Sequence, residues 1–278
     1  MESRTPSRTA IGVAALRAVH QLYDAPPKIL DDPIVPSLLD EGARAALAER
    51  PAWIDDPATR RLRARLVIRS RFSEERLAAA AARGVRQFVI LGAGYDSFAY
   101  RQPAWARDIR ILEVDHPATQ ADKRARLAAA GVAPPDNLTF VPIDFEAMSL
   151  EEGVRASPLD FAQPAFFSCL GVIVYLTPES VDAIFRLVAG FPPGSEIVFS
   201  FSHSGDNAVA ARAAAGGEPW LTHFRRDEIT RRLGALGVSN ITFLTPAETR
   251  RLYFRRPRSD GLEAPPTTFL AAAITGLR

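Results

Sequence analysis

The fold of this chain is decided by ten residues, Gln87-Phe-Val-Ile-Leu-Gly-Ala-Gly-Tyr-Asp96. The apolar run at residues 88–91 is typical of a buried strand in a parallel sheet. Gly92 and Gly94 follow at once, and they allow a tight turn in which the backbone approaches a ligand closely. A buried strand that ends in a glycine loop predicts the first unit of an open α/β sheet.

Strand and helix patterns alternate from this point to the end of the chain, which predicts a mostly parallel sheet with helices on both faces. We therefore expect an α/β, Rossmann-like fold with a seven-stranded sheet. The expected strands are residues 87–91, 109–114, 138–143, 165–170, 196–202, 238–244 and 268–274, and the expected helices among them are residues 117–131, 177–189, 226–236 and 246–253.

Helical patterns precede the sheet, at residues 9–22, in a short helix through Leu38 and Leu39, and at residues 57–82. We expect residues 1–83 to form an N-terminal helical cap with a lead-in helix, and residues 84–278 to form the core. Residues 205–224 contain three glycines and a proline, so they are expected to be an insertion rather than a strand or a core helix. The insertion would act as a lid, with Trp220 and Phe224 as apolar walls and Gly216-Gly217 as a hinge.

The composition is that of a globular protein, with 47% hydrophobic and 24% charged residues in 278, which excludes a wholly disordered or fibrous chain. The 34 basic and 32 acidic residues nearly cancel, giving +2. Cys169 is alone, and no segment approaches the roughly 20 apolar residues that span a bilayer. We therefore expect a cytoplasmic protein. The four histidines have no metal-ligand spacing, so we expect no metal site.

Acidic residues stand at the ends of two further strands, Glu113 and Asp115 after the second and Asp144 after the third. An acid about 20 residues beyond a glycine loop commonly binds ribose hydroxyls, and Glu113 lies 19 residues after Gly94. A dinucleotide would favour a third glycine where Ser97 stands, and Asp96 would repel its pyrophosphate. S-adenosylmethionine, which has no phosphate, suits this loop better. The alternative is that the glycines only turn the chain and the acids cap helices.

Several segments resemble one known family: Pro6-Ser-Arg-Thr-Ala10, Arg69, Gly84–Asp96, Tyr100-Arg101, Glu113-Val-Asp-His-Pro117, Asp144-Phe145, Gly171–Thr177 and Arg258-Ser-Asp-Gly-Leu262. The chain resembles the leucine carboxyl methyltransferase-like family of class I S-adenosylmethionine-dependent methyltransferases, in its bacterial small-molecule O-methyltransferase branch. The glycine loop followed by Glu-Val-Asp-His-Pro is the most specific part. The resemblance extends over nearly the whole chain.

The resemblance implies a role for each cofactor-site residue. It implies that Gly92, Ala93 and Gly94 line the methionine part of S-adenosylmethionine with Asp96 nearby, that Glu113 holds the ribose, and that Asp144 and Phe145 flank the adenine. It also implies that Arg69 clamps the cofactor's carboxylate, although Arg69 could instead be a solvated helix arginine. Two positions depart from the family pattern: Leu170 stands where many relatives have an acid, so any contact there is through backbone or packing, and Phe98 replaces a frequent arginine.

The methyl acceptor is left open by the residues. A carboxylic acid is already ionised at neutral pH, whereas a phenol would benefit from a general base. His203, His223 and Tyr175 are the candidate catalytic residues, and each could equally be structural. Because no confident base is present, we expect a carboxylate of a small organic acid as the acceptor, with hydroxyl O-methylation assisted by histidine as the alternative.

A nucleic-acid partner is a further alternative. Arginines cluster at residues 60–65, 225–226, 231–232 and 250–258, which could be the footprint of an RNA-binding protein or RNA methyltransferase. The acidic residues offset the total charge, and the first cluster would fit on the solvated face of a helix. We therefore expect a small-molecule acceptor rather than nucleic acid or a membrane, while the oligomeric state is not determined by the sequence.

Overall fold

The computed structural model describes residues 6–143, 149–203 and 207–276, and a seven-stranded sheet runs through this part of the chain. The strand order is β3-β2-β1-β4-β5-β7-β6. Neighbouring strands pair in parallel except β7, which is antiparallel to both β5 and β6. The strands are β1 Gln87–Leu91, β2 Arg110–Asp115, β3 Leu138–Pro142, β4 Phe166–Cys169, β5 Glu196–Ser200, β6 Asn240–Phe243 and β7 Leu270–Ile274. The expected α/β fold is confirmed.

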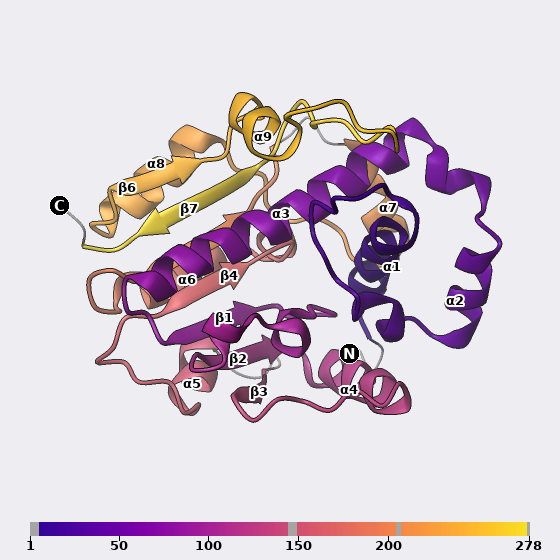
Figure 1. Ribbon diagram of the computed structural model, residues 1–278. Helices are drawn as coiled ribbons and strands as arrows, with labels where there is room; N and C mark the ends of the chain where they lie inside the picture. The colour runs from indigo at the N-terminus through magenta and orange to yellow at the C-terminus, as the bar shows by residue number, and fades with distance from the viewer. Residues whose placement is uncertain (1–5, 144–148, 204–206, 277–278) are drawn as a thin grey trace.

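Helices cover both faces of the sheet (Figure 1). They are α1 Arg8–Tyr23, α2 Glu41–Ala48, α3 Pro57–Ala82, α4 Pro117–Ala129, α5 Leu150–Arg155, α6 Pro178–Ala189, α7 Asn207–Ala215, α8 Arg226–Ala235 and α9 Pro246–Tyr253, with short 3₁₀ turns at Val35–Leu38, Ala52–Asp55, Phe98–Arg101, Ala104–Ala106 and Ile173–Tyr175. On one face Val67 of α3 packs with Phe88, and on the other Phe185 of α6 packs with Phe199. Each buried Phe side chain contributes roughly 1.5–3 kcal/mol.

Three helical segments differ from the sequence expectation. The helix α2 was not expected; its N-cap is Asp40, whose carboxylate accepts a hydrogen bond from the Ala43 N–H at 2.7 Å. The short helix α5 was also not expected, and it begins with a capping box formed by Ser149 and Glu152. Within the insertion, the alanine-rich α7 is helical because alanine has the highest helix propensity and the glycines lie beyond its end.

The direction of the strands places the glycine loop at a topological switch point. Strands β2 and β3 lie on one side of β1, while β4 and β5 lie on the other, so the chain direction across the sheet reverses between β1 and β4. Ligands bind at such points, outside the carboxyl ends of the strands. Figure 1 shows α1, α2 and α7 grouped beyond this end of the sheet.

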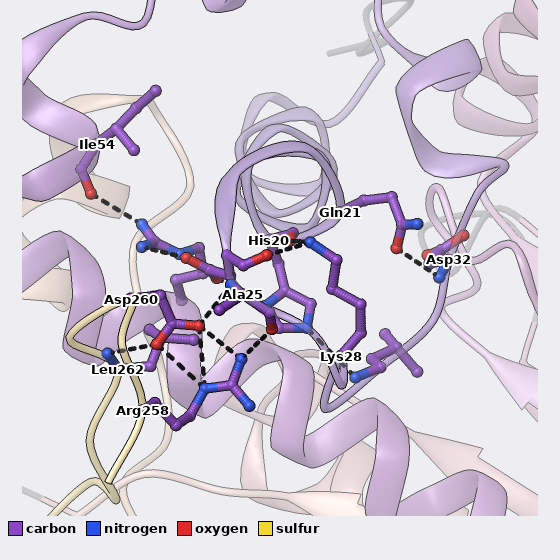
Figure 2. A network of polar contacts seen from close by, with 12 residues as sticks. His20, Gln21, Ala25, Lys28, Asp32, Ile54, Arg258, Asp260 and Leu262 are labelled. Atoms are coloured by element: carbon purple, nitrogen blue, oxygen red, sulfur yellow. Dashed lines mark hydrogen bonds and ion pairs between the residues drawn. The ribbon is translucent and has the colours of Figure 1, made fainter.

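A buried polar network joins the N-terminal helices to α3 and to the segment after α9 (Figure 2). Arg63 donates to both carboxylate oxygens of Asp24, at 2.8 and 2.9 Å, and His20 contacts the same carboxylate at 2.7 Å. Asp260 accepts from the Ala25 N–H at 2.8 Å. Arg63 is only 1% exposed, so the expectation that the arginines of residues 60–65 share a solvated face is wrong. The ion pair with Asp24 compensates the charge of this buried guanidinium.

Candidate active site

A cavity of about 910 Å³ opens at the switch point. Its wall combines the glycine loop after β1, the end of β2, the segment after β4, one face of α1, one face of α3, and the insertion of residues 205–224. The sequence predicted both the loop and the cap. The tertiary structure shows that the loop and the cap enclose the same space.

The glycine loop is shaped for close approach, and Gly92, Ala93, Gly94 and Asp96 all line the cavity. Gly92 has φ +66°, and a Cβ there would lie 2.2 Å from the Val172 side chain, so no larger residue fits. Gly94 donates its N–H to the carboxylate of Asp115 at 2.5 Å. Asp96 accepts from the Phe98 N–H at 2.8 Å, which fixes the end of the loop.

Arg69 of α3 lines the cavity wall between Gly171 and Tyr175. Within the described part of the chain, its guanidinium has neither a hydrogen bond nor an ion pair. A Cβ on Gly171 would lie 2.8 Å from one guanidinium nitrogen of Arg69, so the glycine leaves room for that side chain. Burial, with the nearby charge of Arg17, lowers the pKa of Arg69 to about 10. A desolvated cation that makes no ion pair with the described residues fits an anionic ligand group.

Glu113, which the resemblance implied to hold the ribose, is not among the described residues that line the cavity. Its side chain is 0% exposed, and the Lys123 ammonium of α4 donates to it at 2.6 Å. Burial outweighs the attraction of Lys123 and raises the pKa of Glu113 to about 7. Asp115, two residues further on, lines the cavity and accepts from the N–H groups of Gly94 and His116. The acid available at the end of β2 is therefore Asp115.

The other residues predicted for the cofactor site, and Phe98, have these positions in the structure. Leu170 lines the cavity, as a packing contact would require. Phe98 packs edge-on against Phe88, with ring centroids 5.5 Å apart, so an apolar contact takes the place of the arginine of the family pattern. Asp144 and Phe145 lie outside the described residues.

The three candidate catalytic residues separate in the structure. Tyr175 lines the cavity, whereas His203 and His223 do not. Both histidines are exposed; His203 stacks on Phe269 and His223 lies beside Trp220. Cys169 is fully buried, and burial raises the pKa of its thiol to about 12, which leaves it a small apolar residue.

The insertion and the start of α1 meet over the cavity through Glu218. Its carboxylate accepts from the Arg8 N–H at 2.9 Å and the Thr9 N–H at 3.3 Å, and it also contacts the Ser7 and Thr9 hydroxyls. An anion at this helix end also suits the helix dipole. Trp220 lines the cavity as expected, but Phe224 does not, because it is 3% exposed within the core on the α6 face.

Comparison with known proteins identifies the family of this chain. A model of the leucine carboxyl methyltransferase family matches residues 10–189. YktD of Bacillus subtilis, provisionally named an S-adenosyl-L-methionine-dependent methyltransferase, is 32% identical over 95% of this chain and 96% of its own length. The chain belongs to the leucine carboxyl methyltransferase family.

Other similarities extend the comparison. A Mycobacterium tuberculosis H37Rv protein, also provisionally named an S-adenosyl-L-methionine-dependent methyltransferase, is 33% identical over 73% of this chain and 68% of its own length. A crystal structure from Thermobifida fusca, provisionally described as a methyltransferase, aligns with 98% of this chain and 95% of its own at a TM-score of 0.60. At 21% identity this last likeness supports the fold alone. As a leucine carboxyl methyltransferase family member, the protein is an S-adenosylmethionine-dependent methyltransferase.

The residues present fit this family's cofactor. The cofactor carries a carboxylate, which matches the uncompensated Arg69, and it carries ribose hydroxyls, which match a carboxylate at the end of β2. In the described residues no group of three or more His, Cys, Asp or Glu side chains could hold a metal ion, and no helix there is long and apolar enough to cross a membrane.

Several cavity residues were missed by the sequence reasoning. Arg17 of α1 donates to the Tyr95 carbonyl at 3.2 Å and to the Ser97 hydroxyl at 2.6 Å, so the cap is joined to the glycine loop. Asp115 was noted only as a strand-end acid, and His116 and Glu218 were not singled out. One signal in the sequence favoured Asp115 over Glu113. Lys123 is one of only two lysines, and it lies on the helix that covers Glu113, with which it pairs.

Proposed function

We propose that this family member methylates a carboxylate of a small organic acid, using S-adenosylmethionine. The observation that carries the proposal is that neither candidate base, His203 nor His223, lines the cavity. An ionised carboxylate needs no base, since its pKa of about 4 leaves it charged at neutral pH.

The chain's own residues would hold the cofactor in two places. Arg69 would bind the carboxylate, and Asp115 would bind the ribose hydroxyls, replacing Glu113 in that role. When bound, the cofactor supplies an electrophilic methyl group on a sulfonium. The protein's contribution is to orient the acceptor and to exclude water from the cavity, for which the Glu218 contact between the insertion and α1 is suited.

His116 lines the cavity but is poorly suited to act as a base. Its Nδ1 accepts from the Ala118 N–H at 3.2 Å, as the N-cap of α4. A neutral ring that accepts at Nδ1 carries its proton on Nε2, so it has no second lone pair to receive one. This supports a carboxylate acceptor over a hydroxyl acceptor.

The test is methyl transfer from S-adenosylmethionine labelled in the methyl group to a panel of organic acids and phenols. We expect a labelled product from an acid that releases labelled methanol under mild base, as a methyl ester does. A base-stable product, formed from phenols alone, would overturn the proposal.

The double variant H203A/H223A distinguishes the two acceptor classes further. We expect its kcat/KM for the acid to stay within about twofold of the parent, because neither imidazole reaches the cavity. A loss of about 100-fold or more would indicate general-base catalysis and a hydroxyl acceptor.

A further inference from the structure

We propose that the acid accepted by this enzyme has a long apolar body, which lies along α3 with its carboxylate toward the glycine loop. This inference rests on the carboxylate acceptor proposed above and specifies its class. It is carried by the length of the cavity along α3 and by the apolar side chains that line it and are exposed at it.

The cavity follows α3 well beyond the cofactor end. Thr59, Leu62, Arg65, Leu66 and Arg69 line it, at spacings of three and four residues that place them on one face of the helix. Thr59 lies ten residues before Arg69, which corresponds to about 15 Å along the helix axis at 1.5 Å per residue. Because Arg69 stands near Gly171 at the switch point, the cavity extends about 15 Å from there toward the start of α3.

Apolar side chains from other elements also line the cavity. Val13 and Leu16 of α1 line the cavity, and Trp53 of the 3₁₀ turn before α3 lies beyond Thr59. From the insertion come Trp220 and Leu221. A volume of about 910 Å³ lies near the upper end of the roughly 300–1,000 Å³ usual for ligand sites, which leaves space for an acceptor beside a cofactor.

Exposure of large apolar side chains points to the same stretch. Of the four that are exposed in the described residues, two line this cavity: Trp53 at 44% and Leu221 at 55%. Apolar side chains left in water at the mouth of a cavity commonly mark a binding surface, because a ligand that covers them removes that area from water.

Charged residues line the cavity at the strand ends, on α1, on α3 and in the insertion, and Arg65 lies within the stretch along α3. Asp96 and Asp115 belong to the strand ends, and Arg17 donates to the glycine loop. On α3 the charge nearest to Arg69 is Arg65, one turn away, whose guanidinium donates to the Thr267 hydroxyl at 3.1 Å. The carboxylate has to reach the cofactor's methyl group at the glycine-loop end, so the stretch along α3 receives the rest of the molecule.

The test is a series of unbranched alkanoic acids from butanoate to tetradecanoate. We expect kcat/KM for ester formation to rise about fourfold for each added methylene, from the roughly 0.8 kcal/mol of a buried CH₂. The rise should stop once the chain fills the stretch. The same trend is expected for equilibrium binding to protein saturated with S-adenosylhomocysteine, followed by the fluorescence of Trp53 and Trp220.

Two variants locate the apolar body. The variant L62W, which narrows the stretch, should shift the preferred acid to a shorter chain, and L62A should reduce the gain per methylene. Leu22→Trp is the matched control, because Leu22 is 51% exposed and does not line the cavity. Unchanged affinity for S-adenosylhomocysteine in each variant checks that the fold is intact.

The outcomes separate this inference from the proposed function. Methyl esters formed from acids of every length with equal kcat/KM, or equally well by L62W, would overturn the apolar body while keeping the carboxylate acceptor. No ester from any acid, with methyl transfer to a phenol, would overturn the proposed function and this inference with it.

Discussion

Replacing Arg69 by Met should make the cofactor-free protein no less stable while weakening cofactor binding. The charged guanidinium is disfavoured in the folded protein, since burial lowers its pKa from 12.5 to about 10. At 1.36 kcal/mol per pH unit, that difference corresponds to about 3 kcal/mol. This is the upper limit of the increase in the free energy of unfolding that we expect for R69M. The gain should be constant between pH 6 and 9, because the side chain stays charged below its folded-state pKa and the penalty is relieved only above it.

The bound state should show the opposite effect. A hydrogen-bonded pair between a guanidinium and a carboxylate contributes about 1.5–3 kcal/mol, so R69M should bind S-adenosylhomocysteine roughly 10- to 150-fold more weakly. Titration calorimetry measures this loss, and urea unfolding measures stability. For 5′-methylthioadenosine, which has no carboxylate, R69M and the parent should bind alike.

The control for these measurements is Arg61→Met, on the exposed side of the same helix, which should leave both affinities unchanged. An equal loss of affinity for both ligands in R69M would refute the role of Arg69 as a carboxylate clamp. A large loss of stability in the cofactor-free R69M protein would refute the claim that its charge lacks a partner.

Three further predictions concern the cavity and the elements around it. Gly171→Ala, at φ +75° and with Arg69 2.8 Å from the new Cβ, should displace that guanidinium and weaken S-adenosylhomocysteine binding about tenfold by calorimetry; unchanged affinity would contradict the close fit. Lys123→Met should cost about 3–5 kcal/mol at pH 8 in urea unfolding, by leaving Glu113 buried without its cation. The folded-state pKa of Glu113 is raised above its unfolded value of 4.5, so its ionisation lowers the free energy of unfolding as pH rises through about 7. The loss of stability in K123M should therefore be smaller at pH 5 than at pH 8. Equal losses at both pH values would count against this. Glu218→Ala should speed amide exchange in the first turn of α1 at least tenfold, whereas no change would show that the insertion does not hold that helix.

The glycine loop and the succession of strands along the chain could be predicted from the sequence because their signals are local. The apolar run of residues 88–91 and the glycines after it determine a strand and a turn within a few residues. The signal that would show which acidic residue lines the site was weaker. Glu113 and Asp115 are both acidic strand-end residues, and nothing within the strand tells which of them meets the ligand.

The sequence by itself determined the fold class and the position of the glycine loop, since these depend on short-range patterns of apolar residues and glycines, and its motifs carried the resemblance to the family. Only the tertiary structure decided which side chains face the cavity. Lys123 comes from α4 to bury Glu113, α1 and the insertion meet through Glu218, and the exposed histidines are excluded from the cavity wall. Burial and pairing of charge depend on contacts between segments far apart in the chain, and those contacts form only when the helices pack on the sheet.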